Sequence, residues 1–213
     1  FHLATPEPAL HGMGGEVGVP WFGGAARCGL LSGRHYNGLT NFSFSVWVKN
    51  PSVGSFGYTS NGTTERYGTV LAQGALGNLP GFCCFVQQMT GTPDRLRMQT
   101  RSADNKTTVW SAELAPLADG KWHHVAFTHD WTAKEGRLYV DGRAVDILAP
   151  GDGRTMVNPT SWSWTQFSMG VRNQNGTENS AQDFPYRGEL AQVTLWNRAL
   201  TSDDVQRLRR HPP

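Results

Sequence analysis

The sequence has few charged residues and no long apolar run. Asp, Glu, Lys and Arg make up 17% of its 213 residues, and the formal net charge is +2 with the two signs interspersed. No basic stripe is present that would indicate a nucleic-acid partner. No apolar stretch approaches the roughly 20 residues that a membrane-spanning helix needs. We therefore expect neither a nucleic-acid partner nor a helical membrane span, and the oligomeric state is left open.

Cysteine is also scarce, because only Cys28, Cys83 and Cys84 are present. This odd count leaves two alternatives open: one disulfide from Cys28 to a member of the adjacent pair, or a reduced and buried set. Adjacent residues of a strand point to opposite faces, so Cys83 and Cys84 cannot share one partner. A chain of this length can bury a full core without cross-links.

Turn formers and aromatic residues are abundant, with 25 Gly, 12 Pro and 8 Trp. This composition favours many short strands joined by turns. Apolar and alternating runs predict strands over residues 26–31, 42–49, 67–73, 82–89, 95–101, 107–113, 122–129, 137–141, 143–147, 164–170 and 188–196. With one helix and no break in composition, the pattern predicts a single antiparallel β-sandwich domain over 1–213, in which 1–24 is loop-like.

Two local signals are specific. Asp141-Gly142 between LYV and RAV predicts a two-residue hairpin turn, because Asp and Gly tolerate the positive φ values that such a turn requires. The segment TSDDVQRLRR over 201–210 predicts a short C-terminal helix. It has a hydroxyl residue at its start, two Asp in its first turn and Arg near its end, all of which suit the helix dipole.

Four Asn-x-Ser/Thr triplets predict glycosylation, at Asn41, Asn61, Asn105 and Asn175. The first residues, FHLATPEPAL, do not read as a signal peptide, so the protein is either cytosolic or has lost that segment. The four triplets favour the second alternative, and we expect a secreted, extracellular glycoprotein.

The stretch KWHHVAFTHDWTAKEGRLYVDG over 121–142 holds three histidines and two aspartates. In a strand, Trp122 and His124 lie on one face, while His123 and His129 lie on the other. The latter two are six residues apart, which is roughly 20 Å along a strand. One metal ion, with ligand distances near ~2 Å, cannot join them. We therefore interpret this stretch as sheet structure.

The same stretch carries a family resemblance. DGKWHHVAFTHD followed by GRLYVDG resembles a signature of laminin-G-like and pentraxin-like domains, within the concanavalin A-like lectin/glucanase superfamily. GELAQVTLWNRAL with SDDVQRL is similar to the last strand and trailing helix of that family, and FSFSVWVKN is similar to an early strand. The resemblance spans roughly residues 25–210 and implies a jelly-roll sandwich. Because the superfamily holds lectins, adhesion modules, hydrolases and lyases, it does not fix the function.

The resemblance implies calcium at one edge of the sandwich, where it would assist the binding of sugar hydroxyls. Calcium takes six to eight oxygen ligands, normally including carboxylates. The candidate ligands lie in the 54–66 and 172–186 loops and are Asn61, Asn173, Asn175 and Asp183. Many relatives have acidic residues where this chain has Ala191 and Gln192, and this departure weakens the expectation of calcium.

Exposed aromatic side chains can stack on the apolar faces of sugar rings. Trp47, Trp110, Trp122 and Trp196 are expected in the core. The candidate carbohydrate-binding residues are instead Trp162, Trp164, Asn173 and Tyr186. We therefore expect recognition of a glycan or polysaccharide, as a lectin-like domain.

An enzyme is the main alternative. Alternation along RLRMQTR places Arg97, Gln99 and Arg101 on one face, and arginine can hold a uronate carboxylate with two parallel hydrogen bonds. With Tyr139 or His124 transferring the proton, this set would suit a polysaccharide lyase acting on the concave sheet. The same residues also suit a plain solvated face. No carboxylate triplet of a sandwich glycosidase is present. A protein-binding adhesion module is a further alternative that the fold allows.

Overall fold

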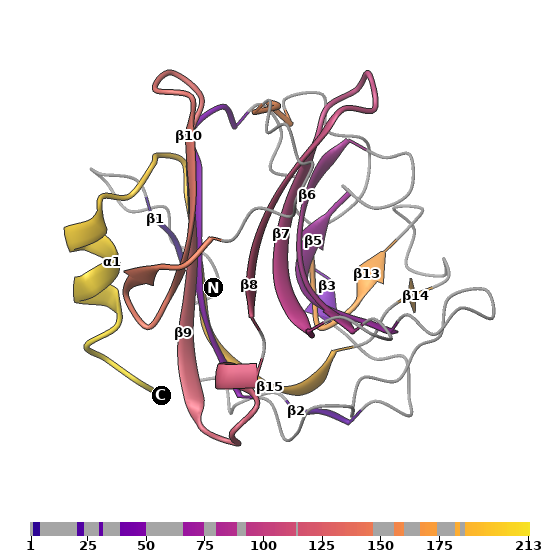
Figure 1. The fold of residues 1–213 in the computed structure, drawn as a ribbon, viewed down its shortest axis with the longest axis vertical. Helices are drawn as coiled ribbons and strands as arrows, with labels where there is room; N and C mark the ends of the chain where they lie inside the picture. Colours follow the sequence, from indigo (N-terminus) through magenta and orange to yellow (C-terminus); the bar gives the residue numbers. More distant parts are fainter. Residues whose placement is uncertain are drawn as a thin grey trace.

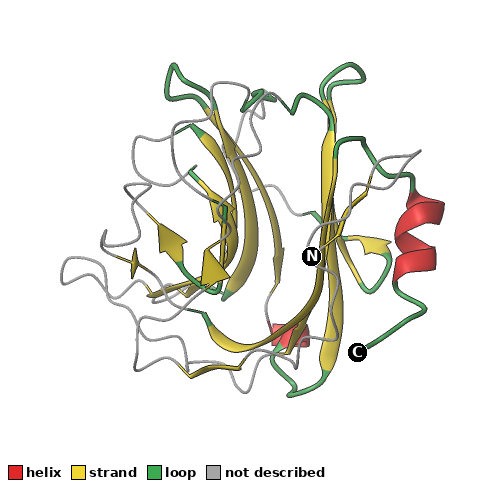
Figure 2. Ribbon diagram, turned by 180° about the vertical axis from the view of Figure 1, so that it is seen from behind, coloured by secondary structure: helices red, strands yellow, loops and turns green. Residues whose placement is uncertain are grey.

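The computed structural model of the chain describes residues 2–4, 21–23, 30–31, 39–49, 66–74, 80–88, 93–113, 115–146, 156–159, 167–173, 182–183 and 186–213. Within these residues two β-sheets pack face to face (Figure 1). A short helix lies on the outer side of one sheet (Figure 2). We call the face of each sheet that meets the other sheet its inner face. The predicted β-sandwich with one C-terminal helix is confirmed.

The larger sheet has seven strands, with the order β1-β15-β4-β9-β10-β11 and with β2 also paired to β15. Its strands are β1 (His2–Ala4), β2 (Trp21–Gly23), β4 (Phe42–Lys49), β9 (Trp122–Asp130), β10 (Glu135–Val140), β11 (Arg143–Ala144) and β15 (Arg187–Trp196). All of its pairs are antiparallel except the pair of β1 and β15.

The second sheet has six strands, in the order β3-β12-β5-β6-β7-β8. Its strands are β3 (Leu30–Leu31), β5 (Arg66–Gln73), β6 (Gly81–Gln88), β7 (Arg95–Arg101), β8 (Thr107–Glu113) and β12 (Ser168–Met169). A separate two-stranded ribbon consists of β13 (Arg172–Asn173) and β14 (Gln182–Asp183). The remaining elements are the 3-10 helix η1 (Ala115–Leu117) and the helix α1 (Ser202–Leu208).

The strands with strong alternation agree best with the prediction. The predicted runs 42–49, 95–101 and 107–113 are reproduced as β4, β7 and β8. Among the described residues of the runs 26–31, 143–147 and 164–170, the strands are β3, β11 and β12. Within the segment 1–24, predicted as loop-like, the described residues are the three-residue strands β1 and β2, which both pair with β15.

The core lies between the inner faces of the two sheets. Val125 and Phe127 of β9 point inward, as the alternation of this strand predicted, and both are fully buried. Phe127 meets the indole of Trp110 on β8 edge-on, with ring centroids 4.7 Å apart. Leu96 and Met98 of β7 complete the contact from the six-stranded sheet. The aromatic rings thereby join the two sheets at the centre of the sandwich.

Gly136 makes room for Trp110. A Cβ atom at residue 136 would lie 2.3 Å from the indole Cζ2 of Trp110, which is far inside van der Waals contact. Trp110 itself is fully buried. The absence of a side chain at Gly136 therefore lets the indole of β8 pack directly against the backbone of β10 in the opposite sheet.

Residues 156–159 link the two sheets through the backbone of Val157. Its N–H donates to Thr108 Oγ1 at 3.0 Å, and its carbonyl accepts from Thr100 Oγ1 at 3.3 Å. The same carbonyl lies 3.3 Å from Nε2 of His129, whose Nδ1 lies 2.9 Å from the carbonyl of Thr40. Because β7 and β8 belong to one sheet and β9 to the other, Val157 bridges the two sheets at their shared edge.

Helix α1 covers the outer face of the seven-stranded sheet. Val205 packs on Ala126, Tyr139 and Trp196, which are all buried. Thr201 and Asp204 form a capping box that pairs the backbone groups at the start of the helix. No helix among the described residues has the length and apolarity to cross a membrane.

Ser43 of β4 also holds the chain that leads into α1. Its hydroxyl donates to the carbonyl of Arg198 at 3.0 Å and accepts from the N–H of Leu200 at 2.9 Å. Asp141 and Gly142 have φ values of 49° and 78°, as the predicted hairpin turn requires. Gln206 of α1 donates to the carbonyl of Gly142 at 2.6 Å. The C-terminal helix is therefore tied to strands from both halves of the sequence.

The contact between Gly136 and Trp110 can be tested by adding one methyl group. We expect Gly136→Ala to lower the free energy of unfolding by about 3 kcal/mol, because the new methyl group overlaps the buried indole. Gly120→Ala is the comparison, since nothing lies within 4 Å of a Cβ at residue 120 and only its φ of 76° is unfavourable. The free energy of unfolding of that variant should fall by about 1 kcal/mol. Urea unfolding measures both, and equal losses would contradict the packing role of Gly136.

Candidate functional site

The outer face of the six-stranded sheet carries the arginine strand. Leu96, Met98 and Thr100 of β7 are buried on the inner face, so Arg95, Arg97, Gln99 and Arg101 point outward and are half-buried. In Figure 1 the strands β5, β6 and β7 bow toward the seven-stranded sheet, which leaves this outer face hollow. The predicted placement of Arg97, Gln99 and Arg101 on one face is therefore observed, on the concave side of the sheet.

A hydrogen-bonded row crosses three neighbouring strands on this face. Tyr67 of β5 is paired with Gln87 of β6, and Nε2 of Gln87 donates to the hydroxyl of Tyr67 at 3.2 Å. The side-chain oxygen of Gln87 accepts a hydrogen bond from the guanidinium of Arg97 on β7. The Cζ atom of Arg97 also lies 5.9 Å from the ring centre of Phe85, its neighbour in the register. Gln87 and Phe85 together orient the guanidinium on the sheet.

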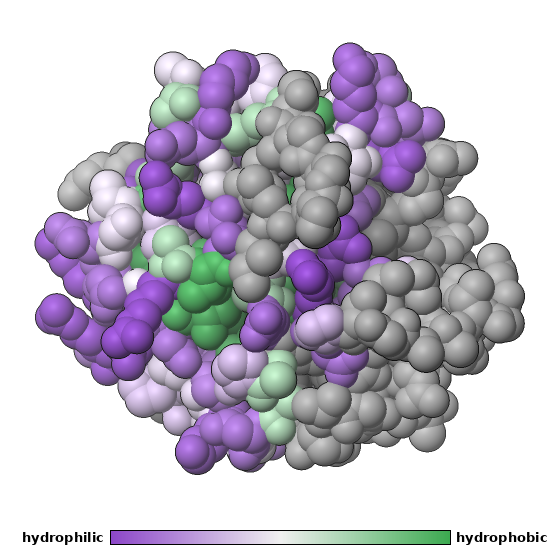
Figure 3. Space-filling view, viewed as in Figure 1, coloured by the Kyte–Doolittle hydropathy of each residue, from purple (hydrophilic) through white to green (hydrophobic). Residues whose placement is uncertain are grey.

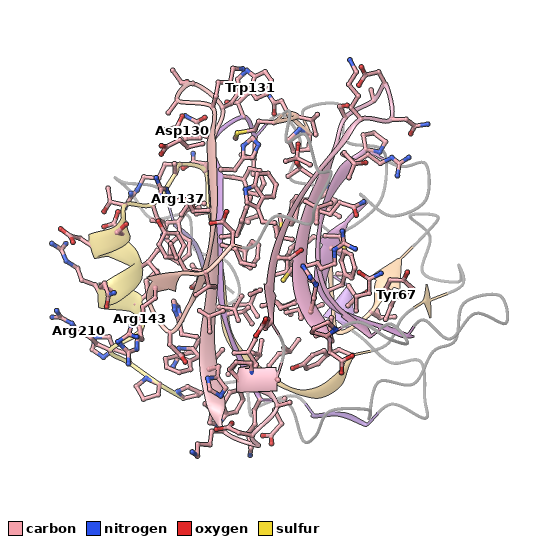
Figure 4. All side chains as sticks on the ribbon, viewed as in Figure 1. Tyr67, Asp130, Trp131, Arg137, Arg143 and Arg210 are labelled. Carbon is pink, nitrogen blue, oxygen red and sulfur yellow. The ribbon has the colours of Figure 1, made fainter. Side chains whose placement is uncertain are left out.

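This face differs from an ordinary solvated sheet surface. Phe85 is 2% exposed, Cys83 is fully buried and Ser111 is 3% exposed, although all three lie on the outer face. The polar groups of the row therefore sit in a partly desolvated setting, in which charge-assisted hydrogen bonds are stronger than in water. Figure 4 shows Tyr67 on the side of the sheet that faces away from the seven-stranded sheet.

The β13–β14 ribbon lies on the same side. It brings together Asn173 and Asp183, which were predicted from sequence as ligands in one loop. Asn173 is paired with Gln182, and Asp183 is paired with Arg172. Strand β13 contacts β5, which also carries Tyr67 (Figure 1). The described part of the 172–186 loop therefore adjoins the arginine-bearing face.

The proton-transfer residues of the lyase hypothesis lie elsewhere. Tyr139 and His124 point outward from the seven-stranded sheet, whereas Arg97, Gln99 and Arg101 point outward from the six-stranded sheet. Tyr139 is 3% exposed beneath α1, and its hydroxyl lies 3.3 Å from Oγ of Ser202. The predicted grouping of these five residues was wrong, because the strands that carry them belong to different layers of the sandwich.

Tyr186 is a core residue. It is fully buried within the hydrophobic cluster between the sheets, and burial raises the pKa of its hydroxyl well above the usual value. This placement corrects the prediction that Tyr186 stacks on a sugar at the surface. The other candidates Trp162, Trp164, Asn61 and Asn175 lie outside the described residues.

Ala191 and Gln192, at which the sequence departs from the pattern that it resembles, lie at a β-bulge. The register of β15 with β4 shifts between Ala191 and Thr194. Gln192 in this bulge is exposed at a φ of 49°, while Ala191 is 8% exposed and paired with Trp47. Neither side chain carries a carboxylate, so neither residue can supply the charged ligand that calcium sites normally include.

Of the four predicted glycosylation residues, two are described. Asn41 is half-buried, and its side-chain oxygen accepts a hydrogen bond from the N–H of Trp131 at 2.8 Å. Asn105 is exposed at a φ of 66° in the turn between β7 and β8, where its side-chain oxygen accepts from Arg101 Nε at 3.1 Å. Glycosylation remains a prediction at both residues.

His123 links two acidic residues across the lower edge of the sandwich. Its Nδ1 lies 2.9 Å from Oδ2 of Asp141, and its Nε2 lies 3.0 Å from Oδ1 of Asp119. Burial lowers the pKa of His123, but the hydrogen bonds to Asp141 and Asp119 outweigh burial, so the pKa lies above the ordinary 6.5. The side chain is 13% exposed. Among the described residues, no group of three His, Cys, Asp or Glu side chains could hold a metal ion.

The two other histidines of this strand, His124 and His129, are buried. Burial lowers the pKa of His124 to about 4. Its ring nitrogens have no hydrogen-bond partner among the described residues. Burial also lowers the pKa of His129, despite its two carbonyl neighbours. The interpretation of the histidine-rich stretch as sheet structure agrees with these placements.

The sequence and the fold are both similar to those of known proteins. Residues 29–206 match a family model described as the concanavalin A-like lectin/glucanases superfamily, and the chain belongs to that family. No curated protein sequence matches the chain.

Three solved structures are similar in fold. The CBM40 of the Ruminococcus gnavus IT-sialidase is 16% identical with a TM-score of 0.56, over 80% of this chain and 83% of that chain. Its complex with α2,3 sialyllactose has the same identity and coverage and a TM-score of 0.52. The heptameric SAP-like pentraxin from Limulus polyphemus is 15% identical with a TM-score of 0.50, over 80% of this chain and 70% of that chain. At such identities these similarities concern the fold alone.

Sequence reasoning missed Tyr67, Phe85 and Gln87, which surround Arg97. Alternation within the predicted strand 82–89 already places Cys83, Phe85 and Gln87 on one face. What the sequence did not supply was the register, which sets Phe85 opposite Arg97 and Tyr67 opposite Gln87.

The raised pKa of His123 predicts a pH-dependent contribution to stability. Because the folded pKa lies above the unfolded value, this contribution is complete below the unfolded pKa and is lost as the pH rises through the folded pKa. The difference in unfolding free energy between the wild type and His123→Gln should therefore shrink as the pH rises. Urea unfolding of both proteins from about pH 5 to 9 measures it. His124 and His129 are common to both proteins and cancel, so a constant difference would show that His123 is not held in its charged form.

Proposed function

We propose that this protein is an extracellular carbohydrate-binding domain that holds an acidic glycan on the concave face of its six-stranded sheet. The observation that carries the proposal is the orientation of the Arg97 guanidinium. Gln87 accepts a hydrogen bond from it, and the ring of Phe85 lies 5.9 Å from its Cζ atom. An arginine that is oriented in advance loses less side-chain entropy on binding a ligand.

The chemistry of this face suits a carboxylate. A guanidinium presents its N–H donors in a planar fork that matches the two oxygens of a carboxylate. Arg95 and Arg101 point the same way from β7 and add positive charge along the strand. The hydroxyl of Tyr67 adds a polar group of the kind that sugar-binding sites use, while the buried ring of Phe85 supports the guanidinium of Arg97. A uronic or sialic acid residue offers all the complementary groups.

The fold neighbours guide the choice of probe. The CBM40 structures include complexes with α2,3 and α2,6 sialyllactose, which carry one carboxylate on a neutral disaccharide. Sialyllactose and lactose therefore form a matched pair that differs by the acidic sugar. The proposal includes calcium as an assisting ion, with ligands from the 54–66 and 172–186 loops.

Binding is favoured over cleavage. A lyase needs a proton-transferring group beside the arginines, and the predicted candidates Tyr139 and His124 lie on the other sheet. On the described part of the arginine-bearing face, the hydroxyl of Tyr67 accepts a hydrogen bond from Gln87. Gln87 in turn orients Arg97, and Arg97 is not a proton-transferring base. The proposal therefore assigns this face to recognition.

The expected result is that sialyllactose or an oligouronate binds and that Arg97→Ala weakens binding at least about tenfold, the effect of losing a charge-assisted hydrogen-bonded pair. Arg97→Lys should recover little of that loss, because an ammonium group lacks the planar fork. Arg143→Ala is the matched control, since Arg143 is exposed on the other sheet (Figure 4). Isothermal titration calorimetry with calcium, and again with chelator, measures the affinities.

Two results would contradict the proposal. One is binding of lactose and sialyllactose with equal affinity, which would remove any role for the carboxylate. The other is the appearance of unsaturated uronate absorbance during incubation with acidic polysaccharides, which would establish cleavage. Loss of affinity in chelator alone would keep the proposal and assign calcium to the site.

A further inference from the structure

A groove lies at the free edge of the seven-stranded sheet, away from the arginine-bearing face. Its volume is about 700 Å³. The turn between β9 and β10 contributes Trp131 and Lys134, and β10 contributes Glu135–Arg137. Asp146 and Met156 complete the lining. We call this feature the edge groove. Figure 4 shows Trp131 near the tip of the β9–β10 hairpin and Arg137 further down the same hairpin.

The turn at the top of the edge groove holds Trp131 in place. The N–H of Trp131 donates to Oδ1 of Asn41 at 2.8 Å, which fixes its backbone to the start of β4. Lys134 adopts a φ of 57°, and its Nζ lies 3.0 Å from the centre of the Trp131 ring. The ammonium group therefore covers one face of the indole, so a ligand that stacks on this ring has to use the other face. Trp131 is half-buried, so its orientation is set before any ligand arrives.

The floor of the edge groove is backbone. The register pairs Gly136 with His129, and the neighbouring carbonyl of Leu138 accepts from Val145 on the side away from β9. By the alternation of an antiparallel ladder, the N–H and C=O of Gly136 also point away from β9, toward the groove. Behind Gly136 the indole of Trp110 fills the core. This part of the floor thus offers one donor and one acceptor on a rigid support.

The part of the groove lining that Met156 forms is also held by neighbouring residues. Met156 precedes Val157, whose backbone is bonded to Thr108 and Thr100 of the six-stranded sheet. The methionine side chain is half-buried and packs against the main core. Met156 therefore adds a supported apolar side chain to the lining of the groove.

The charges of the lining balance. Lys134 and Arg137 carry positive charges, while Glu135 and Asp146 carry negative ones. Arg137 lies 3.4 Å from Glu135, and both side chains are at least half exposed, so this ion pair is weak and can exchange for ligand contacts. Figure 3 shows mainly hydrophilic residues over the β9–β10 hairpin. The described part of the lining has no net charge and so gives no preference for an anion or a cation, but it is rich in hydrogen-bond donors and acceptors.

From these contacts we propose that the edge groove is a second saccharide-binding subsite, which takes a neutral sugar. The indole of Trp131 packs on the apolar face of the pyranose ring. The carboxylates of Glu135 and Asp146 accept hydrogen bonds from hydroxyl groups, and Lys134, Arg137 and the backbone of Gly136 provide the complementary groups. The subsite belongs to the seven-stranded sheet and does not depend on the arginine-bearing face of the other sheet. A protein with both sites engages two parts of one branched or extended glycan.

The test follows the indole N–H signal of Trp131 by two-dimensional NMR, with the full chain and millimolar galactose, glucose, mannose, N-acetylglucosamine and lactose. At least one of these sugars should shift the Trp131 signal. The signal is assigned to Trp131 because it disappears in the Trp131→Phe variant. The same sugar should bind Trp131→Ala about tenfold more weakly, as followed through backbone amide shifts. Asp146→Asn keeps the shape of the groove and should weaken binding severalfold. Arg97→Ala should leave the affinity for the neutral sugar unchanged.

Several results would overturn the proposal. No shift of the Trp131 signal with any sugar of the panel would do so, as would unchanged affinity in both Trp131→Ala and Asp146→Asn. Loss of neutral-sugar binding in the Arg97→Ala variant would also overturn the proposal, because that result would place the sugar on the arginine-bearing face. The acidic glycan distinguishes the two sites. If sialyllactose still binds to the Trp131→Ala variant, that binding takes place on the concave face.

Discussion

The packing of Trp110 between the sheets is the contact on which the other features depend. Its indole meets Phe127 edge-on and lies directly against Gly136, so β8 of one sheet touches β9 and β10 of the other. Such close contact is open to few residue types, because a protein interior is packed as densely as an organic crystal. The same contact supports β10 from behind, and β10 carries the floor of the edge groove. Core packing and surface recognition are thus coupled at a single glycine.

The two candidate binding surfaces use different parts of the sandwich. The concave face of the six-stranded sheet is built from side chains that alternate outward, in register across β5, β6 and β7. The edge groove is built from a turn, a strand edge and a residue from a distant segment, Met156. The first surface carries three arginines on one strand, whereas the lining of the second is balanced in charge. This division lets one small domain offer two chemically distinct contacts, on separate sheets and without competition for space.

Much of the fold follows from the sequence, and the reason is alternation. RLRMQTR must bury Leu96 and Met98 when one side of its strand faces a core, and Arg97 then points outward. The same rule separates Cys83, on the outer face, from Cys84 in the core. Alternation does not reveal which sheet a strand joins. Tyr139 and His124 also point outward, but from the opposite layer, and their predicted grouping with the arginines failed for that reason. Trp131 and Met156 meet only through tertiary packing, so no local pattern could predict the edge groove.

The position of β4 has a consequence for the order of events during synthesis. This strand, which ends at Lys49, lies between β9 and β15, and β15 ends only at Trp196. A ribosome that adds 5–20 residues per second needs roughly 7–30 s to cover that interval. Until then one edge of β4 is open, and the hydroxyl of Ser43 lacks the Arg198 and Leu200 backbone groups that later enclose it. In a compartment that glycosylates Asn-x-Ser, the Ser43 hydroxyl of the Asn41 triplet therefore becomes enclosed only after β15 and the residues that follow it have docked.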